Sequence, residues 1–456
     1  MTLWGATTKN QLKKLTKNQT KNQNRQTVSS NRNETEITIE KTNYIDSEII
    51  KKNQDFVAIT GAIYSGNKQV SLKKAVNKIN DPTELMQLDG EYAFAWLSNK
   101  KLMLGRDRIG SIPLYYTQAD GVTFSTNQLD ILESTEKKPK RVVPGKLYKI
   151  DGNKIETKNI SNTNDLKNES KTKTTEEYGR EIINKLDQAV QRRVGEETAI
   201  AFSGGVDSSL IAVLADRYTD VTLYTVGYEN SPDIEWSKKA SEHLELPHKP
   251  IEIDLPTIKK TIPETIKATC DATRLSIGVG LPFLILSKKL RKDGYRTVLT
   301  GQGSDELFGG YTKYRNSDNP ETEMARDIDN IAEKDLERDY HVFTNQNILS
   351  KNPFLDQKVV KTALSIPIRD KIPDENEIEK KILRAGAKKL LPPEITKKPK
   401  KSLQYGSRVD REIDRIARRN GYKRREKHHV DKYLAAESKK IFKKTVSKHV
   451  TRSFNN

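Results

Sequence analysis

One short loop combines the residue types that bind the phosphates of a nucleotide. Residues 203–209 read S-G-G-V-D-S-S and lie between an apolar strand and an apolar helix. The two glycines let the backbone approach an anion closely, while the hydroxyl groups and the following helix N-terminus supply hydrogen-bond donors. The carboxylate of Asp207 would repel a phosphate unless a cation lay between them, so the loop predicts Mg²⁺ as well as a nucleotide. No Gly-Lys-Ser/Thr follows, which excludes a Walker loop.

A second glycine-rich turn places two acids side by side. Residues 300–311 read T-G-Q-G-S-D-E-L-F-G-G-Y and follow another apolar strand, expected over residues 296–300. Asp305 could provide a second carboxylate for the metal, and Glu306 could meet the ammonium group of a substrate. The two loops together predict a site for a nucleotide, a divalent cation and an amine-bearing substrate.

The elements that carry the first loop alternate between strands and helices. We expect strands at 198–202, 221–226 and 249–253, with helices at 209–217 and 233–243 between them. Strands and helices that alternate at this spacing predict a parallel sheet with helices on both faces. An earlier helix is expected to begin at a Thr-Glu capping box, residues 174 and 177, and the chain beyond residue 285 reads as mostly helical.

Composition and periodicity divide the whole chain into five regions. We expect a weakly structured Lys/Asn-rich segment at residues 1–45 and a β-rich domain at residues 46–150. A polar linker at residues 151–173 would lead to an α/β domain at residues 174–420, and a basic, irregular C-terminal tail would follow at residues 421–456.

Charge and composition exclude several classes of protein. The 456 residues include 81 Lys and Arg against 62 Asp and Glu, a net charge of +19. Nucleic acid would suit that charge, but the lysines are spread along the chain, which favours an ordinary solvated surface and leaves nucleic acid as a less favoured partner. No apolar run approaches the ~20 residues of a membrane helix, and no signal segment is evident, so a cytoplasmic protein without membrane contact is expected. The single cysteine, Cys270, excludes an intramolecular disulfide.

The two loops resemble those of a known family. Residues 203–209 resemble the pyrophosphatase loop of ATP pyrophosphatases, and residues 300–311 resemble the S-G-E-G-x-D-E-x-F-G-G-Y segment of the asparagine synthetase family. The stretches V-G-Y at 226–228, P-F-L-D at 353–356 and K-P-K-K at 398–401 look like the same family. The resemblance implies an α/β fold: a parallel-sheet, HUP-like ATP pyrophosphatase domain, preceded by a truncated, β-rich, Ntn-type glutamine amidotransferase-like domain.

The resemblance also implies roles for individual residues. Asp207 and Asp305 would hold Mg²⁺–pyrophosphate, and Lys400 would neutralise the leaving pyrophosphate. Gln302 and Glu306 would bind the substrate. The ATP site would be formed, together with Asp207, by Ala201, Ser203, Gly204, Gly205, Ser208, Ser209, Val226, Thr300 and Gly301. One departure stands out, because Gln302 occupies a position where the family usually has Glu, and an amide cannot take a proton.

The N-terminal half resembles the family's glutaminase domain but lacks its chemistry. Residues 89–95, D-G-E-Y-A-F-A, look like one of that domain's strands, and Asp89 is retained. Position 2, however, is Thr2 instead of the nucleophilic cysteine. Thr60 replaces the oxyanion-stabilising Asn, and Ala62 replaces the substrate-binding Glu. We interpret this region as an inactive remnant.

These observations predict an asparagine-synthetase-like amidoligase. It would adenylate the side-chain carboxylate of aspartate, convert ATP to AMP and pyrophosphate, and transfer ammonia to form asparagine. Free ammonia is favoured over glutamine as the nitrogen source, and a homodimer is among the assemblies that the sequence allows. Two alternatives stay open: a β-lactam-synthetase-like ligase that acts on another carboxylate, and a tRNA-modifying ATP pyrophosphatase or RNA-binding protein.

Overall fold

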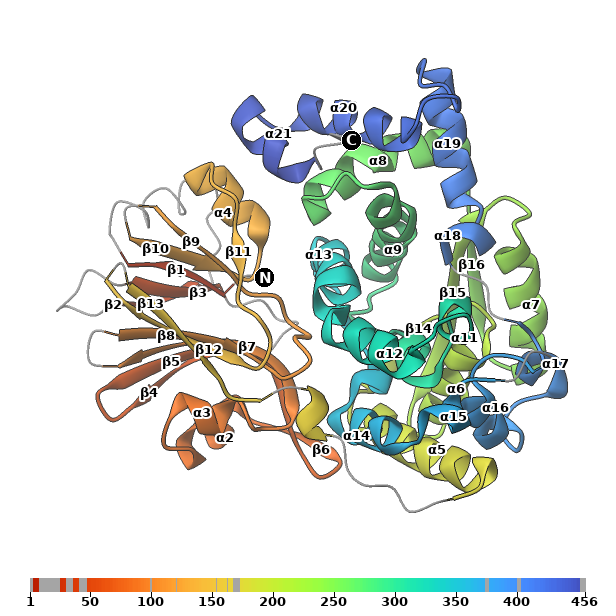
Figure 1. Cartoon of the computed structure of the whole chain (residues 1–456), viewed down its shortest axis with the longest axis horizontal. Helices are drawn as coiled ribbons and strands as arrows, with labels where there is room; N and C mark the ends of the chain where they lie inside the picture. The colour runs from red at the N-terminus through yellow and green to blue at the C-terminus, as the bar shows by residue number, and fades with distance from the viewer. Residues whose placement is uncertain are drawn as a thin grey trace.

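The chain folds into a β-rich N-terminal domain and an α/β C-terminal domain that lie side by side (Figure 1). The computed structural model describes residues 3–7, 25–29, 36–40, 47–98, 101–119, 121–152, 154–161, 163–166, 173–373, 377–399 and 403–451. The predicted fold class, a parallel-sheet α/β domain preceded by a β-rich domain, is therefore confirmed.

The N-terminal domain contains two antiparallel sheets. The first has the order β11-β9-β10-β1-β3-β2, with strands Lys140–Arg141, Tyr115–Gln118, Val122–Ser125, Leu3–Ala6, Glu36–Glu40 and Arg25–Ser29. The second has the order β13-β12-β8-β7-β5-β4, with strands Lys154–Asn159, Lys146–Asp151, Lys101–Arg106, Gly90–Ser98, Asp55–Ser65 and Ser47–Lys52; β6 (Lys68–Val70) pairs with β5.

Alternation along β7 explains how the second sheet is covered on both faces. Ala93, Ala95 and Leu97 face a core shared with Val122 and Phe124 of the first sheet. The intervening residues Tyr92, Phe94 and Trp96 belong to a separate core with the helices α2 (Leu72–Lys78) and α3 (Pro82–Leu85). Successive side chains of a strand point to opposite faces, so a strand that is apolar throughout fits a sheet buried on both sides.

Two regional predictions in this half of the chain are wrong. Residues 1–45 are not weakly structured where they are described: β1 pairs with both β3 and β10, and Leu3 and Trp4 are buried. The E-I-T-I-E alternation of β3 was an available signal, obscured by its Lys/Asn-rich surroundings. The expected linker 151–173 begins too early, because residues 154–159 form the edge strand β13.

The C-terminal domain is built on a parallel sheet. Its order is β16-β15-β14-β17-β18, with strands His248–Ile253, Asp220–Tyr228, Glu197–Ala201, Thr297–Leu299 and Leu349–Lys351. All four pairings are parallel. The predicted capping box is present, with Thr174 and Glu177 bonding reciprocally at the start of α5 (Thr175–Gln191).

Helices cover both faces of this sheet, as predicted. Ile200, Leu223 and Leu299 enter one core, whereas their neighbours on the same strands, such as Ala199 and Tyr224, enter the other. The first core is completed by α5, α6 (Val206–Ala215), α14 (Gln357–Ser365) and α16 (Lys381–Ala387). The second is completed by α8 (Leu255–Thr269), α9 (Arg274–Lys292), α19 (Val409–Arg419) and α20 (His429–Ile441).

The remaining helices are distributed over both domains. They are α4 (Gln128–Thr135), α7 (Pro232–Leu244), α10 (Ser304–Phe308), α11 (Thr312–Arg315), α12 (Pro320–Asp329), α13 (Glu337–Thr344), α15 (Ile368–Lys371), α17 (Pro393–Thr396), α18 (Leu403–Gly406) and α21 (Lys444–Val450). A π-helical turn, Ala332–Leu336, leads into α13. Within the described ranges no single helix is long and apolar enough to cross a membrane, although the pair α8 and α9, bent by 105°, meets both criteria together.

The prediction of an irregular tail from residue 421 is also wrong. Residues 429–450 form α20 and α21, which lie across α8 and α19 (Figure 1). Val430, Tyr433 and Leu434 are buried in the same core as α8. Their apolar spacing is that of one helix face, so the basic residues around them cover a packed segment.

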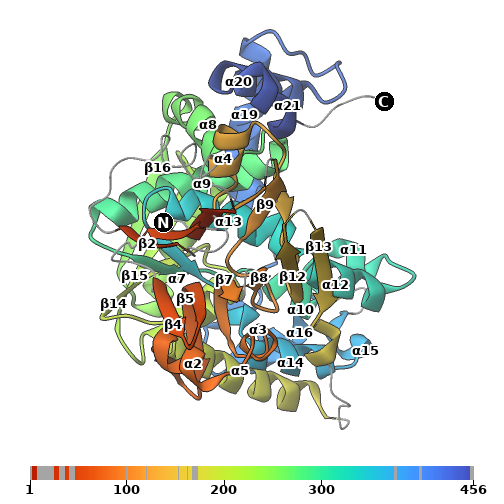
Figure 2. The ribbon, with the colours of Figure 1, turned by 90° about the vertical axis from the view of Figure 1, so that its left-hand side faces the viewer.

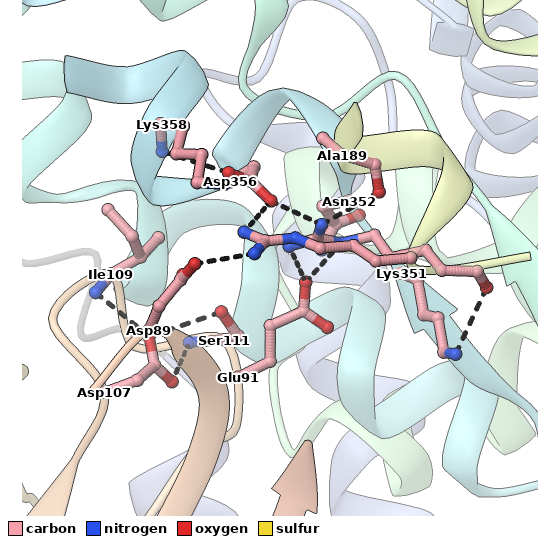
Figure 3. A network of polar contacts seen from close by, with 12 residues as sticks. Asp89, Glu91, Asp107, Ile109, Ser111, Ala189, Lys351, Asn352, Asp356 and Lys358 are labelled. Atoms are coloured by element: carbon pink, nitrogen blue, oxygen red, sulfur yellow. Dashed lines mark hydrogen bonds and ion pairs between the residues drawn. The ribbon is translucent and has the colours of Figure 1, made fainter. Parts of the chain in front are cut away.

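Ion pairs between two arginines and three carboxylates join the domains (Figure 3). Just beyond α5, Arg192 Nη1 lies 2.7 Å from Asp89 Oδ2, and Arg193 Nε lies 2.8 Å from Glu91 Oε1. Both arginines also bind Asp356, which precedes α14, with Arg193 Nη1 2.6 Å from its Oδ2. The two guanidinium groups lie over the ring of Tyr64, 4.4 and 4.8 Å from its centroid. The N-terminal domain is thus fixed directly to the helix that precedes the phosphate loop.

A second buried cluster and a helix contact extend this interface. Glu337 at the start of α13 accepts hydrogen bonds from Arg141 Nε at 2.7 Å and from the hydroxyl of Tyr115 at 2.8 Å, and it pairs with Arg106 at 3.2 Å. Burial alone would raise the pKa of Glu337, but the two arginines outweigh burial and lower it. Figure 2 shows the sheets of the N-terminal domain in front of the C-terminal domain, with α4 beside the C-terminal helices; Lys443 and Glu136 pair there at 3.6 Å.

The interface predicts a strong dependence of stability on Arg193. The substitution Arg193→Ala would leave Glu91 without its buried partner, and removing one member of such a pair costs about 3–5 kcal/mol. We expect the urea midpoint of unfolding to fall accordingly. Arg217→Ala is the matched control, because Arg217 pairs with Asp187 at the surface, where a pair contributes about 0–1 kcal/mol. Equal midpoints for the two variants would contradict this account.

Candidate functional site

A cavity of about 440 Å³ opens at the carboxyl edge of the parallel sheet. Ala201, Val226 and Thr300, which lie at or just beyond the ends of β14, β15 and β17, contribute to its wall. In open α/β sheets ligands bind at this edge, where loops from several strands converge. Apolar side chains of α9, including Pro282, Phe283 and Leu286, line one part of the cavity, and charged side chains line another.

The phosphate loop is shaped by one glycine and one tryptophan. Gly204 has a φ of +68°, and a Cβ added there would lie 2.6 Å from the indole of Trp236. The Trp236 Nε1–H in turn donates to the carbonyl of Gly204 at 2.8 Å. The backbone N–H of Ser203 donates to Ser208 Oγ at 3.2 Å. The N-cap of α6 is Gly205, which has no side chain to accept from the first N–H groups of the helix, so these groups can bind an anion.

Two carboxylates from the two predicted loops converge on one buried lysine. Lys380 Nζ lies 2.5 Å from Asp207 Oδ2 and 2.7 Å from Asp305 Oδ1. The lysine side chain is 1% exposed, against 23% and 21% for the two carboxylates. Burial alone would lower the pKa of Lys380, but the two carboxylates outweigh burial and hold it above its ordinary value. Ser304 Oγ donates to the other oxygen of Asp207 at 2.7 Å.

The glycine-rich turn is needed for this approach. A Cβ added at Gly310 would lie 1.9 Å from Asp305 Oδ1 and 2.5 Å from the Cε of Lys380. The backbone N–H of Gly310 also donates to the carbonyl of Asp305 at 2.8 Å. Any larger residue at position 310 would therefore push apart the carboxylate and the lysine.

Sequence reasoning missed Lys380. It precedes α16 in a run of charged residues, E-K-K at 379–381, that reads as ordinary solvated surface. Its φ of +63° turns the side chain out of the helical path, whereas Lys381, one residue later, pairs with Glu377 at 3.7 Å. Nothing in the spacing distinguishes the two lysines, so only the folded structure identifies the one that enters the site.

The charged part of the cavity is lined by acids and bases together. Glu306 is buried and accepts a hydrogen bond from the hydroxyl of Tyr311 at 2.6 Å. Burial, with the neighbouring charges of Asp305 and Asp335, raises the pKa of Glu306 to about 7. Arg338 lies beside them and pairs with Asp335 at 2.9 Å. This region can therefore accept a small molecule that carries both an ammonium and a carboxylate group.

Most of the predicted site residues lie together in this cavity. They are Ala201, Ser203, Gly205, Asp207, Ser208, Val226, Thr300, Gly301, Gln302, Asp305 and Glu306. Gly204 and Ser209 do not line it: Gly204 shapes the loop from behind, and Ser209 is fully buried in α6. Lys400 lies outside the described residues. Its neighbour Lys398 does line the cavity, with Nζ 4.3 Å from the centroid of a Trp236 ring.

Comparison with known proteins agrees with this geometry. The model of the family described as asparagine synthase matches residues 181–322 and 313–451, and that of a glutamine amidotransferase domain matches residues 68–133. A protein from Methanocaldococcus jannaschii that carries the name of a glutamine-hydrolysing asparagine synthetase is 30% identical over 88% of this chain and 82% of its own. Asparagine synthetase B (glutamine-hydrolysing) from Escherichia coli K12 is 26% identical over 71% of this chain and 62% of its own.

Solved structures show a more distant similarity. An NH3-dependent NAD synthetase from Campylobacter jejuni is 17% identical and covers 62% of this chain and 100% of its own, with a TM-score of 0.28. The family match spans the phosphate loop, both carboxylates and Lys380, and the first relative extends over most of the chain. This chain therefore belongs to the asparagine synthase family of carbon–nitrogen ligases.

Proposed function

We propose that this chain uses ATP to adenylate the side-chain carboxylate of aspartate and then converts the adenylate to asparagine with ammonia. The observation that carries the proposal is the convergence of Asp207 and Asp305 on Lys380, between the phosphate loop and the charged part of the cavity. Two carboxylates and a lysine at that position fit a metal-bound pyrophosphate. The reaction then depends mainly on positioning and on neutralising the departing charge.

ATP would lie with its base in the apolar part of the cavity and its phosphates on the loop. Ser203, Ser208 and the N-terminus of α6 would bind the phosphates. Mg²⁺ fits the remaining donors, because it is commonly held by one or two carboxylates together with substrate phosphates. Asp207 and Asp305 would hold it, and it would neutralise charge on the pyrophosphate. Lys380 would add positive charge beside the pyrophosphate. The resemblance to the family assigns the same role to Lys400.

Aspartate would bind in the charged part of the cavity. Its α-ammonium group suits Glu306 and Asp335, and its α-carboxylate suits Arg338, whose guanidinium lies between acids and faces the same space. The side-chain carboxylate would then point toward the α-phosphorus of ATP. The oxygen of that carboxylate forms the new P–O bond as pyrophosphate leaves.

Three features of the N-terminal domain support ammonia over glutamine. Asp89, the retained carboxylate, is paired with Arg192 of the other domain. Thr60 is buried, and its hydroxyl accepts a hydrogen bond from Ser47 Oγ at 2.8 Å. Ala62 offers no polar group for a substrate. Thr2 lies outside the described residues, so its role stays a sequence-based proposal.

The first test measures products with each nitrogen source. Purified protein with ATP, Mg²⁺ and L-aspartate should form asparagine, AMP and pyrophosphate in equal amounts when ammonium is present. L-Glutamine in place of ammonium should give none. Asparagine from glutamine would contradict the inactive glutaminase. Pyrophosphate release that does not depend on aspartate would be hydrolysis of ATP by water and would contradict aspartate as the substrate.

Lys380→Met should remove the charge that the two carboxylates share. We expect aspartate-dependent pyrophosphate formation to fall about 100-fold or more, the usual effect of losing one preorganised electrostatic group. Without Mg²⁺, the melting temperature of the variant should be lower than that of the wild type. Adding Mg²⁺ should raise the melting temperature of the variant more than that of the wild type, because the ion supplies the missing charge. Lys381→Met is the matched control, since that lysine pairs outside the cavity; similar behaviour of the two variants would refute the assignment.

The raised pKa of Glu306 predicts how aspartate binding depends on pH. Below about pH 7 the carboxyl group becomes protonated and loses its attraction for an ammonium group. The KM for aspartate, measured from pyrophosphate release without ammonia, should rise about tenfold per pH unit below 7. Glu306→Gln should raise that KM at every pH and flatten its profile between pH 6 and 8. A parallel profile in the variant would show that another group titrates.

A further inference from the structure

The side-chain amide of Gln302 is held by a buried carboxylate. Its Nε2 donates a short hydrogen bond to Asp339 Oδ2, across 37 residues of sequence. Asp339 belongs to α13 and is 2% exposed, whereas Gln302 lines the cavity. Gln302 thus has one end of its amide in the protein interior and the rest of its surface toward the site.

Asp339 accepts in this contact, and its other carboxylate oxygen accepts from a guanidinium. Arg338 Nε donates to its other oxygen, Oδ1, at 2.8 Å, and the guanidinium is itself buried. Burial favours the neutral acid and raises the pKa of Asp339, while Arg338 opposes that shift. A carboxylate that is paired with a guanidinium accepts from the NH2 end of an amide, so this contact orients Gln302. No hydrogen bond to Gln302 Oε1 occurs among the residues that the structure describes.

We propose that Asp339 is a positioning residue that keeps the Oε1 of Gln302 toward the cavity, where it accepts a hydrogen bond from the ammonia that attacks the acyl-adenylate. This inference rests on the proposed function. In that step the nitrogen lone pair forms the C–N bond, and the C–O bond to AMP breaks with its electron pair on AMP. The excess proton leaves to water, because an amide cannot take it.

The exchange of Glu for Gln suits a chain that draws ammonia from solution. A carboxylate at this position would favour the ammonium ion, which has no lone pair for attack. A neutral amide oxygen still orients the N–H bonds but does not stabilise the protonated form to the same extent. The amide at 302 and the buried acid at 339 therefore form one arrangement in which the acid orients the amide.

The experiment separates the two half-reactions in Asp339→Ala, Asp339→Asn and the wild type. Aspartate-dependent ATP–pyrophosphate exchange reports adenylation, and asparagine formation over a range of ammonium concentrations reports the second step. Asp339→Ala should raise the KM for ammonium about tenfold, the effect of one misoriented hydrogen bond, with a much smaller change in exchange. Asp339→Asn should lie between, because its amide oxygen can still accept from Gln302. Asp414→Asn is the matched control: Asp414 is buried and paired with arginines, but on α19, away from the cavity.

A compensating pair excludes a purely structural explanation. Gln302→Glu should place a second carboxylate against that of Asp339 and abolish ammonia-dependent synthesis. Gln302→Glu combined with Asp339→Asn should recover part of that synthesis, because the amide at position 339 can donate to the new carboxylate. Equal loss of exchange and ammonia use in the folded Asp339 variants, or an unchanged KM for ammonium, would overturn the proposal. Absence of aspartate-dependent exchange in the wild type would overturn the proposed function, and this inference with it.

Discussion

The positive charge of Lys380, which separates two carboxylates of like charge, organises the site. Asp207 and Asp305 approach each other from loops almost a hundred residues apart, and without a cation between them their repulsion would oppose the fold. Lys380 supplies that cation, from a backbone conformation with positive φ just before α16. The glycine at position 310 leaves space for it. This arrangement of charges stabilises the folded protein. Under the proposed function, the same carboxylates and lysine also bind a metal-bound pyrophosphate.

Two carboxylates of the N-terminal domain form ion pairs across the interface between the domains. Asp89 directly precedes β7 and Glu91 is the second residue of that strand, and both are paired with arginines that follow α5. Since α5 packs against α6, whose N-terminus forms the phosphate loop, the N-terminal domain supports the site from behind. The N-terminal domain therefore has a structural role whatever its chemistry, because removing it would expose two arginines and Asp356 that are now buried together.

Sequence patterns predicted the parallel sheet, the phosphate loop and the two acids because each has a local signature. Glycines with hydroxyl residues at a strand–helix junction are such a signature, and short apolar strands that alternate with helices are another. Lys380 has none, since a lysine in a charged run is ordinary surface until a backbone turn directs it inward. Asp339 is missed for the same reason, because its importance depends on Gln302, which approaches only in the folded chain. Composition misled at both ends, where Lys/Asn-rich sequence concealed β1, β3 and α20.

Under the proposed function, an inactive glutaminase domain and an amide at position 302 are consistent with each other in physical terms. An enzyme that receives ammonia from a neighbouring domain obtains it already deprotonated, whereas one that takes it from solution must select the minor neutral form. A carboxylate at the point of attack would work against that selection, and an amide oriented by Asp339 would not. The arginines that pair with Asp89 and Glu91 occupy the two carboxylates at the start of β7. Under the proposed function, the contacts of the N-terminal domain and those of Gln302 thus favour the same nitrogen source independently of each other.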